Sequence, residues 1–181
     1  MARPTTAARR YAEAAFELAR RDDALDAWRD DLALSAQLLG DERVAEIVGS
    51  PARPIGDRRA LIDRLLEPRV QPAMRNLARL LAERGRIDLL PAVASEYRRL
   101  LNRHRGIVPA TVTSAAPLTA EETDAIRSRV RRMSGADVEL TTEVDPALIG
   151  GLTIRVGDRL LDASVRGRLE RLRDQLIAGT R

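Results

Sequence analysis

The apolar positions of the first 105 residues recur at helical spacing, in short segments separated by glycine and proline. Residues three and four positions apart share one face of a helix, so this spacing predicts amphipathic helices. Thr5 and Thr6 are the expected N-caps of the first helix. Helices this short are not stable alone, so we expect them to bury their apolar stripes together in a six-helix bundle. The predicted helices cover the apolar residues of 8–19, of 25–39 before Gly40, of 44–48, of 61–65 before Pro68, of 71–84 before Gly85, and of 88–104 before Gly106, with His104 at the end of the last stripe.

From Gly106 onward the pattern changes to an alternation of apolar and polar residues, which is typical of half-buried strands. Pro109 cannot donate to a ladder, so we expect the strand over 107–114 to lie at a sheet edge or to begin just after this residue. Thr119 and Glu122 have the spacing of a capping box, which predicts a helix as far as Gly135. Further predicted elements are a strand over 138–144, a hairpin around Gly157 and Asp158, and a final helix capped by Asp162 or Ser164 with Val165, Leu169, Leu172 and Leu176 on one stripe.

The sequence therefore predicts a mainly α protein, in which a helical bundle over residues 1–105 precedes a small α/β domain over residues 106–181. The length of 181 residues is sufficient for two small domains. Hydrophobic residues make up 44% of the chain and aromatic residues only 2%. A core built mostly from Leu, Ala, Val and Ile favours closely packed helices over an aromatic-rich sandwich.

Charge and cysteine content limit the possible partners and compartments. All 31 basic residues are arginine, yet the formal net charge is only +4 and opposite charges are interspersed. A nucleic-acid footprint needs basic charge gathered on one face or in a tail, so nucleic acid is not an expected partner. The absence of cysteine excludes disulfides and thiolate metal sites and indicates the reducing cytoplasm. With no signal peptide and no run of 18 apolar residues, we expect no direct membrane insertion.

No group of residues has the arrangement of a catalytic or metal site. His104 is the only histidine and has no second histidine or cysteine with which to bind a metal. Asp158 and Asp162 fit turn formation and helix capping better than acid–base catalysis, which needs two carboxylates in different environments around a cleft. Ser164 lacks the flanking glycines of a nucleophile elbow. We therefore predict no catalytic residue, no metal and no cofactor.

The first and fifth predicted helices carry more apolar breadth than a peripheral helix needs. Core packing and a groove for the amphipathic helix of a partner both explain this breadth, and the residues alone do not decide between them. The residues concerned are Tyr11, Ala14, Ala15, Phe16 and Leu18 on the first helix, and Asn76, Leu77, Leu80, Leu81 and Arg84 on the fifth.

The most distinctive segment is LIGGLTIRVGDRLLDASVRGRLERL, which begins at Leu148. Its glycine pair precedes a strand, whereas the glycines of a phosphate-binding loop follow a strand and open a helix. The segment closely resembles the C-terminal signature of the delta subunit of F-type ATP synthases, whose mitochondrial counterpart is the oligomycin sensitivity-conferring protein. The matching positions include Gly150, Gly151, Ile154, Arg155, Gly157, Asp158, Asp162, Ser164, Arg166, Gly167 and Leu169.

The resemblance extends over essentially the whole chain and departs from the family at two visible positions. Ala163 stands where the family often has glycine, and Arg10 stands where many relatives have proline. For Arg166, a solvated surface position and a buried ion pair with Asp158 or Asp162 are both open.

The resemblance implies a non-catalytic stator subunit of an F1Fo ATP synthase, peripheral on the cytoplasmic face of the bacterial plasma membrane. In the family, the groove of helices one and five receives the N-terminal helix of an alpha subunit of the catalytic head. The C-terminal part, including 150–169, is then expected to meet a b-type subunit of the peripheral stalk. A free-standing helical adaptor, or a nucleic-acid-binding regulator suggested by the arginine content, is the alternative.

Overall fold

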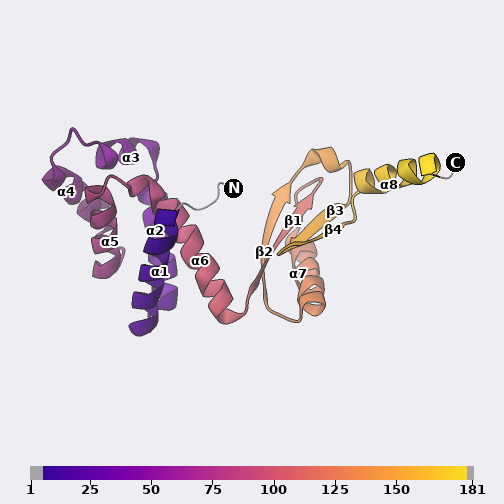
Figure 1. Cartoon of the computed structure of the whole chain (residues 1–181), viewed down its shortest axis with the longest axis horizontal. Helices are drawn as coiled ribbons and strands as arrows, with labels where there is room; N and C mark the ends of the chain where they lie inside the picture. Colours follow the sequence, from indigo (N-terminus) through magenta and orange to yellow (C-terminus); the bar gives the residue numbers. More distant parts are fainter. Residues whose placement is uncertain (1–5, 179–181) are drawn as a thin grey trace. The chain divides into compact units, whose positions relative to one another are not determined.

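The computed structural model describes residues 6–178, and Figure 1 shows them as helices followed by a small sheet with two further helices. The predicted mainly helical fold with a small C-terminal sheet is confirmed. The cap expected at Thr5 lies outside the described residues, and Thr6 is already helical. The helices before the sheet are α1 (Thr6–Arg21), α2 (Leu25–Leu39), α3 (Glu42–Gly49), α4 (Ile55–Leu66), α5 (Pro72–Glu83) and α6 (Leu90–Arg105), with a 3-10 turn, η1 (Ile87–Leu89), before α6.

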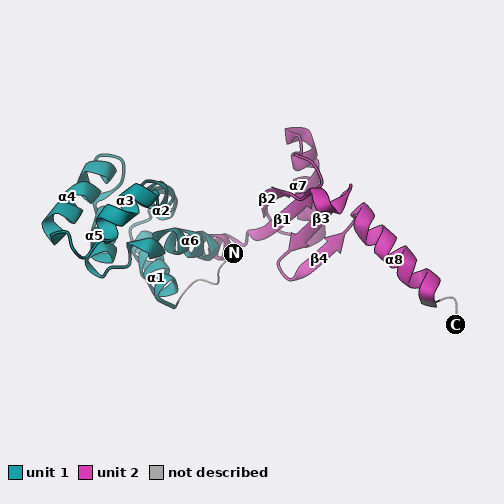
Figure 2. Cartoon of the chain, turned by 90° about the horizontal axis from the view of Figure 1, so that it is seen from above, with its two compact units in different colours: residues 1–101 teal, residues 102–181 magenta. Residues whose placement is uncertain are grey.

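The chain divides between Leu101 and Asn102 into two compact units, coloured separately in Figure 2. The core of the first unit contains side chains from all six of its helices. It is mostly aliphatic, as the composition predicts, and Trp28 is only 2% exposed. Phe16 meets Tyr97 edge to face at 5.7 Å, and the Tyr97 hydroxyl donates to the carbonyl of Leu25 at 2.9 Å. A buried tyrosine thus satisfies its polar group while it fills the core.

Local signals in the sequence explain where these helices begin and end. Asp41 caps α3, because its side chain accepts from the backbone N–H groups of Arg43 and Val44. Gly85 has a φ of +62° and ends α5 in a Schellman motif, in which the N–H of Arg86 donates to the carbonyl of Leu81 at 2.8 Å. The sequence-based placement of His104 on an inward stripe is wrong. This residue lies in the last turn of α6 with its side chain exposed, since the core side of α6 ends at Leu101.

The second unit is a four-stranded sheet in the order β2-β1-β3-β4, with α7 packed on one face. Strands β1 and β2 are parallel and α7 connects them, whereas β1 with β3 and β3 with β4 are antiparallel. The predicted capping box of α7 is confirmed by reciprocal hydrogen bonds between Thr119 and Glu122. Its elements are β1 (Val108–Ser114), α7 (Ala120–Ser134), β2 (Val138–Val144), η2 (Pro146–Leu148), β3 (Leu152–Val156), β4 (Arg159–Asp162) and α8 (Val165–Ala178).

Of the two alternatives predicted at Pro109, the edge strand is wrong, because β1 is an interior strand of the sheet. The strand itself begins at Val108, and only its pairing with β3 begins just after the proline. The N–H of Val108 donates toward β2, to the carbonyl of Asp137 at 2.8 Å. Successive residues of a strand direct their backbone polar groups to opposite sides, so those of Pro109 point toward β3. The carbonyl of Pro109 accepts from the N–H of Gly157 in the turn after β3, and the β1–β3 register begins only at Ala110. The proline ring nitrogen therefore faces a point beyond the end of the ladder, where no N–H is needed.

The final helix differs from the others in its exposure. The apolar stripe that the sequence predicts on α8 is present, but it is not buried against the sheet. Leu169, Leu172 and Leu176 are 54%, 53% and 66% exposed. Most of the large exposed apolar side chains among the described residues lie between Val144 and Ile177, in the second unit. A face of this kind is the usual mark of an interaction surface.

Candidate partner-binding surfaces

An apolar groove of about 780 Å³ lies along α1 and α5, with Trp28 of α2 among its lining residues. Its walls are made of small side chains, including Ala7, Ala14 and Ala73, which leave space for another helix to approach closely. Two of the large apolar side chains exposed in the first unit, Leu18 and Leu80, are also part of this lining, at 41% and 40% exposure. Among residues 6–178, the lining consists of Thr6, Ala7, Arg10, Tyr11, Ala14, Ala15, Leu18, Trp28, Ala73, Asn76, Leu77, Leu80 and Arg86.

The charged residues of the groove lining are all cationic. Arg10 comes from α1 and Arg86 from the turn that follows α5, and no aspartate or glutamate of the described residues lines the groove. Asn76 contributes an amide. Its Oδ1 accepts from Arg79 Nη1 at 3.3 Å, and Arg79 Nη2 in turn meets Asp63 Oδ1 at 2.6 Å. Arginine has only donors, so the amide oxygen must face Arg79 and the amide NH₂ is left as a donor.

The structure brings together most of the residues that the sequence marked on α1 and α5. Tyr11, Ala14, Ala15, Leu18, Asn76, Leu77 and Leu80 all line the groove. Phe16 and Leu81 lie instead in the core, at 8% and 0% exposure, because they face the other helices of the unit. Arg84 is exposed beyond the end of α5 and is not part of the lining.

Sequence reasoning missed several lining residues. Ala7 and Ala73 carry too little side chain to stand out in an apolar pattern, and Trp28 is a buried core residue that also contributes to the lining. Arg86 comes from a turn rather than from a helical stripe, and its position depends on the Schellman motif at Gly85. That glycine is the one local signal that could have indicated it.

The signature segment holds α8 against β3 by close backbone approaches. Gly151 has a φ of +74°, and a side chain there would place its Cβ 2.5 Å from the carbonyl oxygen of Ala163. The N–H of Val165 donates to the carbonyl of Gly150 at 2.9 Å, and that of Ala163 donates to Leu152 at 3.0 Å. The glycine pair is thus needed to let the start of α8 pass close to the start of β3.

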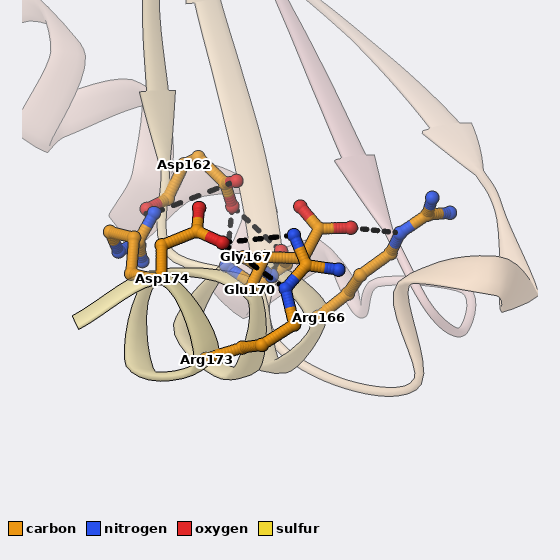
Figure 3. A network of polar contacts seen from close by, with 8 residues as sticks. Asp162, Arg166, Gly167, Glu170, Arg173 and Asp174 are labelled. Atoms are coloured by element: carbon orange, nitrogen blue, oxygen red, sulfur yellow. Dashed lines mark hydrogen bonds and ion pairs between the residues drawn. The ribbon is translucent and has the colours of Figure 1, made fainter. Parts of the chain in front are cut away.

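The first turn of α8 is capped by Asp162 and Ser164 together, so the two alternatives from the sequence are both part of one cap. Figure 3 shows the polar contacts around Asp162 at the start of α8. Ser164 is buried, and its Oγ accepts from the N–H of Gly167 at 3.0 Å. Asp162 Oδ1 accepts from the Ser164 hydroxyl at 2.7 Å and from its N–H at 2.9 Å. A Cβ at Gly167 would lie 2.2 Å from Asp162 Oδ2, so only glycine fits beside this cap.

The other signature residues have separate roles in the structure. Ile154 is 6% exposed in the small core that α7 covers, whereas the side chains of Arg155 and Leu169 are exposed. Gly157 (φ +56°) and the exposed Asp158 form the turn between β3 and β4. The buried ion pair considered for Arg166 is not formed. Arg166 is exposed and pairs with Glu170 at 3.0 Å, while Arg171 is the arginine near Asp162, at 3.9 Å.

The cap makes the attachment of α8 dependent on pH. Hydrogen bonds from the Ser164 hydroxyl and N–H, with a smaller contribution from Arg171, hold the pKa of the Asp162 carboxyl below its usual range. Because the pKa of Asp162 is lowered in the folded state, the ionised carboxyl stabilises that state fully above its unfolded-state pKa, about 3.9. This stabilisation is lost as the pH falls through the folded-state pKa. We expect amide protection in the first turn of α8 to decrease below about pH 4 in a hydrogen-exchange titration monitored by NMR.

The variant Asp162→Asn should show weaker protection of this turn at neutral pH and no such decrease in acid. Asp174→Asn is the matched control, because Asp174 lies on α8 itself and, among the described residues, pairs with its neighbour Arg173 rather than with the cap. If wild type and Asp162→Asn lose protection at the same pH, the cap is not the cause.

Neither surface resembles a reaction centre. Within residues 6–178, no three His, Cys, Asp or Glu side chains gather as they would around a metal ion. The described helices also include none with the length and hydropathy of a membrane span. Asp158 and Asp162 do not flank a cleft, since one is in an exposed turn and the other is in the α8 cap.

Comparison with known proteins gives matches over nearly the whole chain. Residues 7–176 match the family model described as ATP synthase delta (OSCP) subunit. A curated protein named ATP synthase subunit delta from Xanthomonas oryzae pv. oryzae is 40% identical over 176 residues, which cover 97% of this chain and 99% of that protein. One of the same name from Dehalococcoides mccartyi is 36% identical over 172 residues, which cover 95% and 94%.

A solved structure extends the likeness to three dimensions. One chain in the cryo-EM structure of the Toxoplasma gondii mitochondrial ATP synthase hexamer superposes with a TM-score of 0.69 at 26% identity. The match covers 96% of the present chain and 98% of that chain, so both units are included. From the family match over nearly its whole length, this chain belongs to the ATP synthase delta (OSCP) subunit family.

Proposed function

We propose that this chain joins the catalytic head of a rotary ATP synthase to the peripheral stalk. The full-length match to a family of non-catalytic ATP synthase subunits carries the proposal. Proton flow turns the rotor, and the same torque acts on the head. A stator must hold the head still so that rotation drives ATP synthesis. Such a protein needs binding energy and stiffness rather than a reaction centre, and its place is peripheral, on the cytoplasmic face of the plasma membrane.

The first unit, as a six-helix bundle, is the proposed head-binding part. Its groove runs from Thr6 to Leu18 along α1, which corresponds to about 18 Å of helix, or just over three turns. An apolar channel of this length fits the N-terminal helix of an alpha subunit, with anchors at helical spacing facing Tyr11, Ala14 and Leu77. The small lining residues let the two backbones approach, and burial of the exposed Leu18 and Leu80 supplies apolar area.

The second unit is the proposed stalk-binding part, and its exposed α8 stripe supports this role. Leu169, Leu172 and Leu176 are separated by three and four residues, the spacing with which one helix packs along another. A helix of a b-type stalk subunit is the expected partner. In this proposal the signature residues Gly151, Asp162 and Ser164 act mainly by fixing α8 to the sheet, and the contact residues begin near Val165.

The test is a deletion that removes α8. Tagged full-length chain and a variant without residues 164–181 are each expressed in the native cell and isolated from detergent-solubilised membranes. We expect the full chain to recover the alpha and beta subunits together with the stalk subunit, and the variant to recover only the head. Recovery of the stalk by both forms would exclude α8 as its binding site, and recovery of no ATP synthase subunit by the full chain would reject the proposal.

The alternative of a free-standing adaptor or a nucleic-acid-binding regulator is not favoured. Both relatives named above are ATP synthase subunits by name and match over nearly their whole length. Many exposed arginines are engaged within the chain, as in the pairs of Arg20 with Glu17 and of Arg59 with Glu83. A surface with its cations already paired is a poor electrostatic footprint for phosphate.

A further inference from the structure

We propose that the groove along α1 and α5 selects its occupant by charge, and takes an amphipathic helix that carries carboxylates beside its apolar stripe. Arg10 and Arg86 are the residues that recognise these carboxylates, and Asn76 supplies a third donor. The inference rests on the proposed function in one respect, because it takes the occupant to be the N-terminal helix of the alpha subunit.

The groove lining carries positive charge with no negative charge from the described residues to balance it. Arg10 and Arg86 are both exposed, and no hydrogen bond or ion pair within residues 6–178 engages either guanidinium. The other arginines of α1 and α5 are paired. Arg9 meets Glu96 at 3.7 Å, and Arg79 meets Asp63 at 2.6 Å. The two arginines in the groove lining are therefore left to find their counter-ions on whatever docks there.

Arg10, Arg86 and Asn76 each offer hydrogen-bond donors in the groove lining. Both arginines can only donate, and the Asp63–Arg79 pair holds the oxygen of the Asn76 amide so that its NH₂ group remains a donor. The amide belongs to the lining of the groove and also to that of a second pocket, which Arg79 and Asp63 line as well. An occupant must therefore offer acceptors, and carboxylates offer the strongest ones.

The rest of the groove lining is apolar, which excludes a free anion as the natural occupant. Alanines, leucines and Trp28 make up most of the groove. A small anion would leave this area in contact with water, whereas an amphipathic helix covers it and brings acidic side chains to the rim. A helix with lysine or arginine at the same places would meet like charges. The arginines thus act as specificity determinants beside the apolar contact, which supplies the affinity.

The experiment measures the binding of synthetic peptides with the N-terminal segment of the cognate alpha subunit to the full-length chain. One peptide has the natural sequence, and in the other each Asp and Glu is replaced by Asn or Gln. We expect wild type to bind the natural peptide about tenfold more tightly than the neutral one at low salt. The double variant Arg10→Gln/Arg86→Gln should bind both peptides alike. Its affinity for the natural peptide should be about the same as the affinity of wild type for the neutral peptide. These expectations follow from about 0.7 kcal/mol for each partly exposed pair.

Arg84→Gln is the matched control, because Arg84 is exposed near the end of α5 but is not part of the lining. It removes one positive charge from the same region, so it reports the general effect of net charge. The charge inference is overturned if wild type binds both peptides equally, or if Arg84→Gln weakens binding as much as Arg86→Gln alone. If wild type binds neither peptide, the groove assignment in the proposed function fails as well. The two failures are therefore distinguishable.

Discussion

Replacing Ala14 with aspartate is expected to weaken binding of the alpha-subunit N-terminal helix at least about 100-fold while the first unit stays folded, because a carboxylate would lose its water inside an apolar interface. Ala14 lines the groove and its side chain is exposed, so the free protein can hydrate the new carboxylate. Docking would strip that water from it. The new side chain would also be one helical turn from Arg10 and would compete with the occupant for that guanidinium. Tyr11→Asp is expected to act in the same direction, with a larger cost to folding, since Tyr11 is half-buried.

Ala60→Asp is the control for this prediction. Ala60 is an exposed alanine in α4 and does not line the groove, so the same change of charge and helix propensity should leave peptide binding unaltered. Affinity is measured by titration calorimetry with the alpha peptide, and folding by the thermal transition of the first unit. If Ala14→Asp binds like Ala60→Asp, the alpha helix docks elsewhere.

The helical part of the fold could be predicted because its signals are local. The spacing of apolar residues, the closing Gly85 and the capping box at Thr119 each act within one or two helical turns. The position of β1 within the sheet was not predictable in the same way. Whether Pro109 is compatible with an interior strand depends on where β3 ends, and β3 is more than 40 residues later in the sequence.

The groove was only partly predictable for a related reason. A helix that is apolar on more than one face does not reveal which face is inward. Phe16 is in the core and Leu18 is in the groove, although both are large apolar residues two positions apart on α1. The choice between them is made by the packing of the other helices. Charge selection was likewise hidden, because a free arginine and a paired arginine look alike in a sequence.

The apolar stripe of α8 is an instructive case, since the spacing predicts the stripe but does not indicate its environment. Periodicity shows that a helix has an apolar face, and burial inside the same chain is the usual reason for one. Here the described residues leave Leu169 and Leu172 more than half exposed. A subunit of an assembly can carry a stripe whose partner is encoded by another gene, and a single sequence does not distinguish these two situations.

Replacing Gly151 with alanine is expected to destabilise the second unit by about 2–4 kcal/mol, the sum of a left-handed backbone and a backbone clash. The φ of +74° is unfavourable for any residue with a side chain. The new Cβ would also lie 2.5 Å from the carbonyl oxygen of Ala163 and 3.1 Å from Ser164 Cα. Both atoms belong to the backbone, so no rotamer change can relieve the contact. We expect earlier unfolding of the sheet unit in urea, and faster amide exchange in β3 and in the first turn of α8.

Two other glycines separate the contributions to this effect. Gly157 also has a positive φ, of +56°, but a Cβ there would meet nothing within 4 Å, so Gly157→Ala should cost about 1 kcal/mol from backbone strain alone. Gly56, in the first turn of α4, has open space and an ordinary φ, so Gly56→Ala should be neutral or slightly stabilising. The order Gly151, Gly157, Gly56 is therefore the expected order of destabilisation. Equal effects at Gly151 and Gly157 would mean that the close approach of β3 to the start of α8 contributes nothing to the stability of the second unit. The attachment of α8 to the sheet would then depend on the cap formed by Asp162 and Ser164.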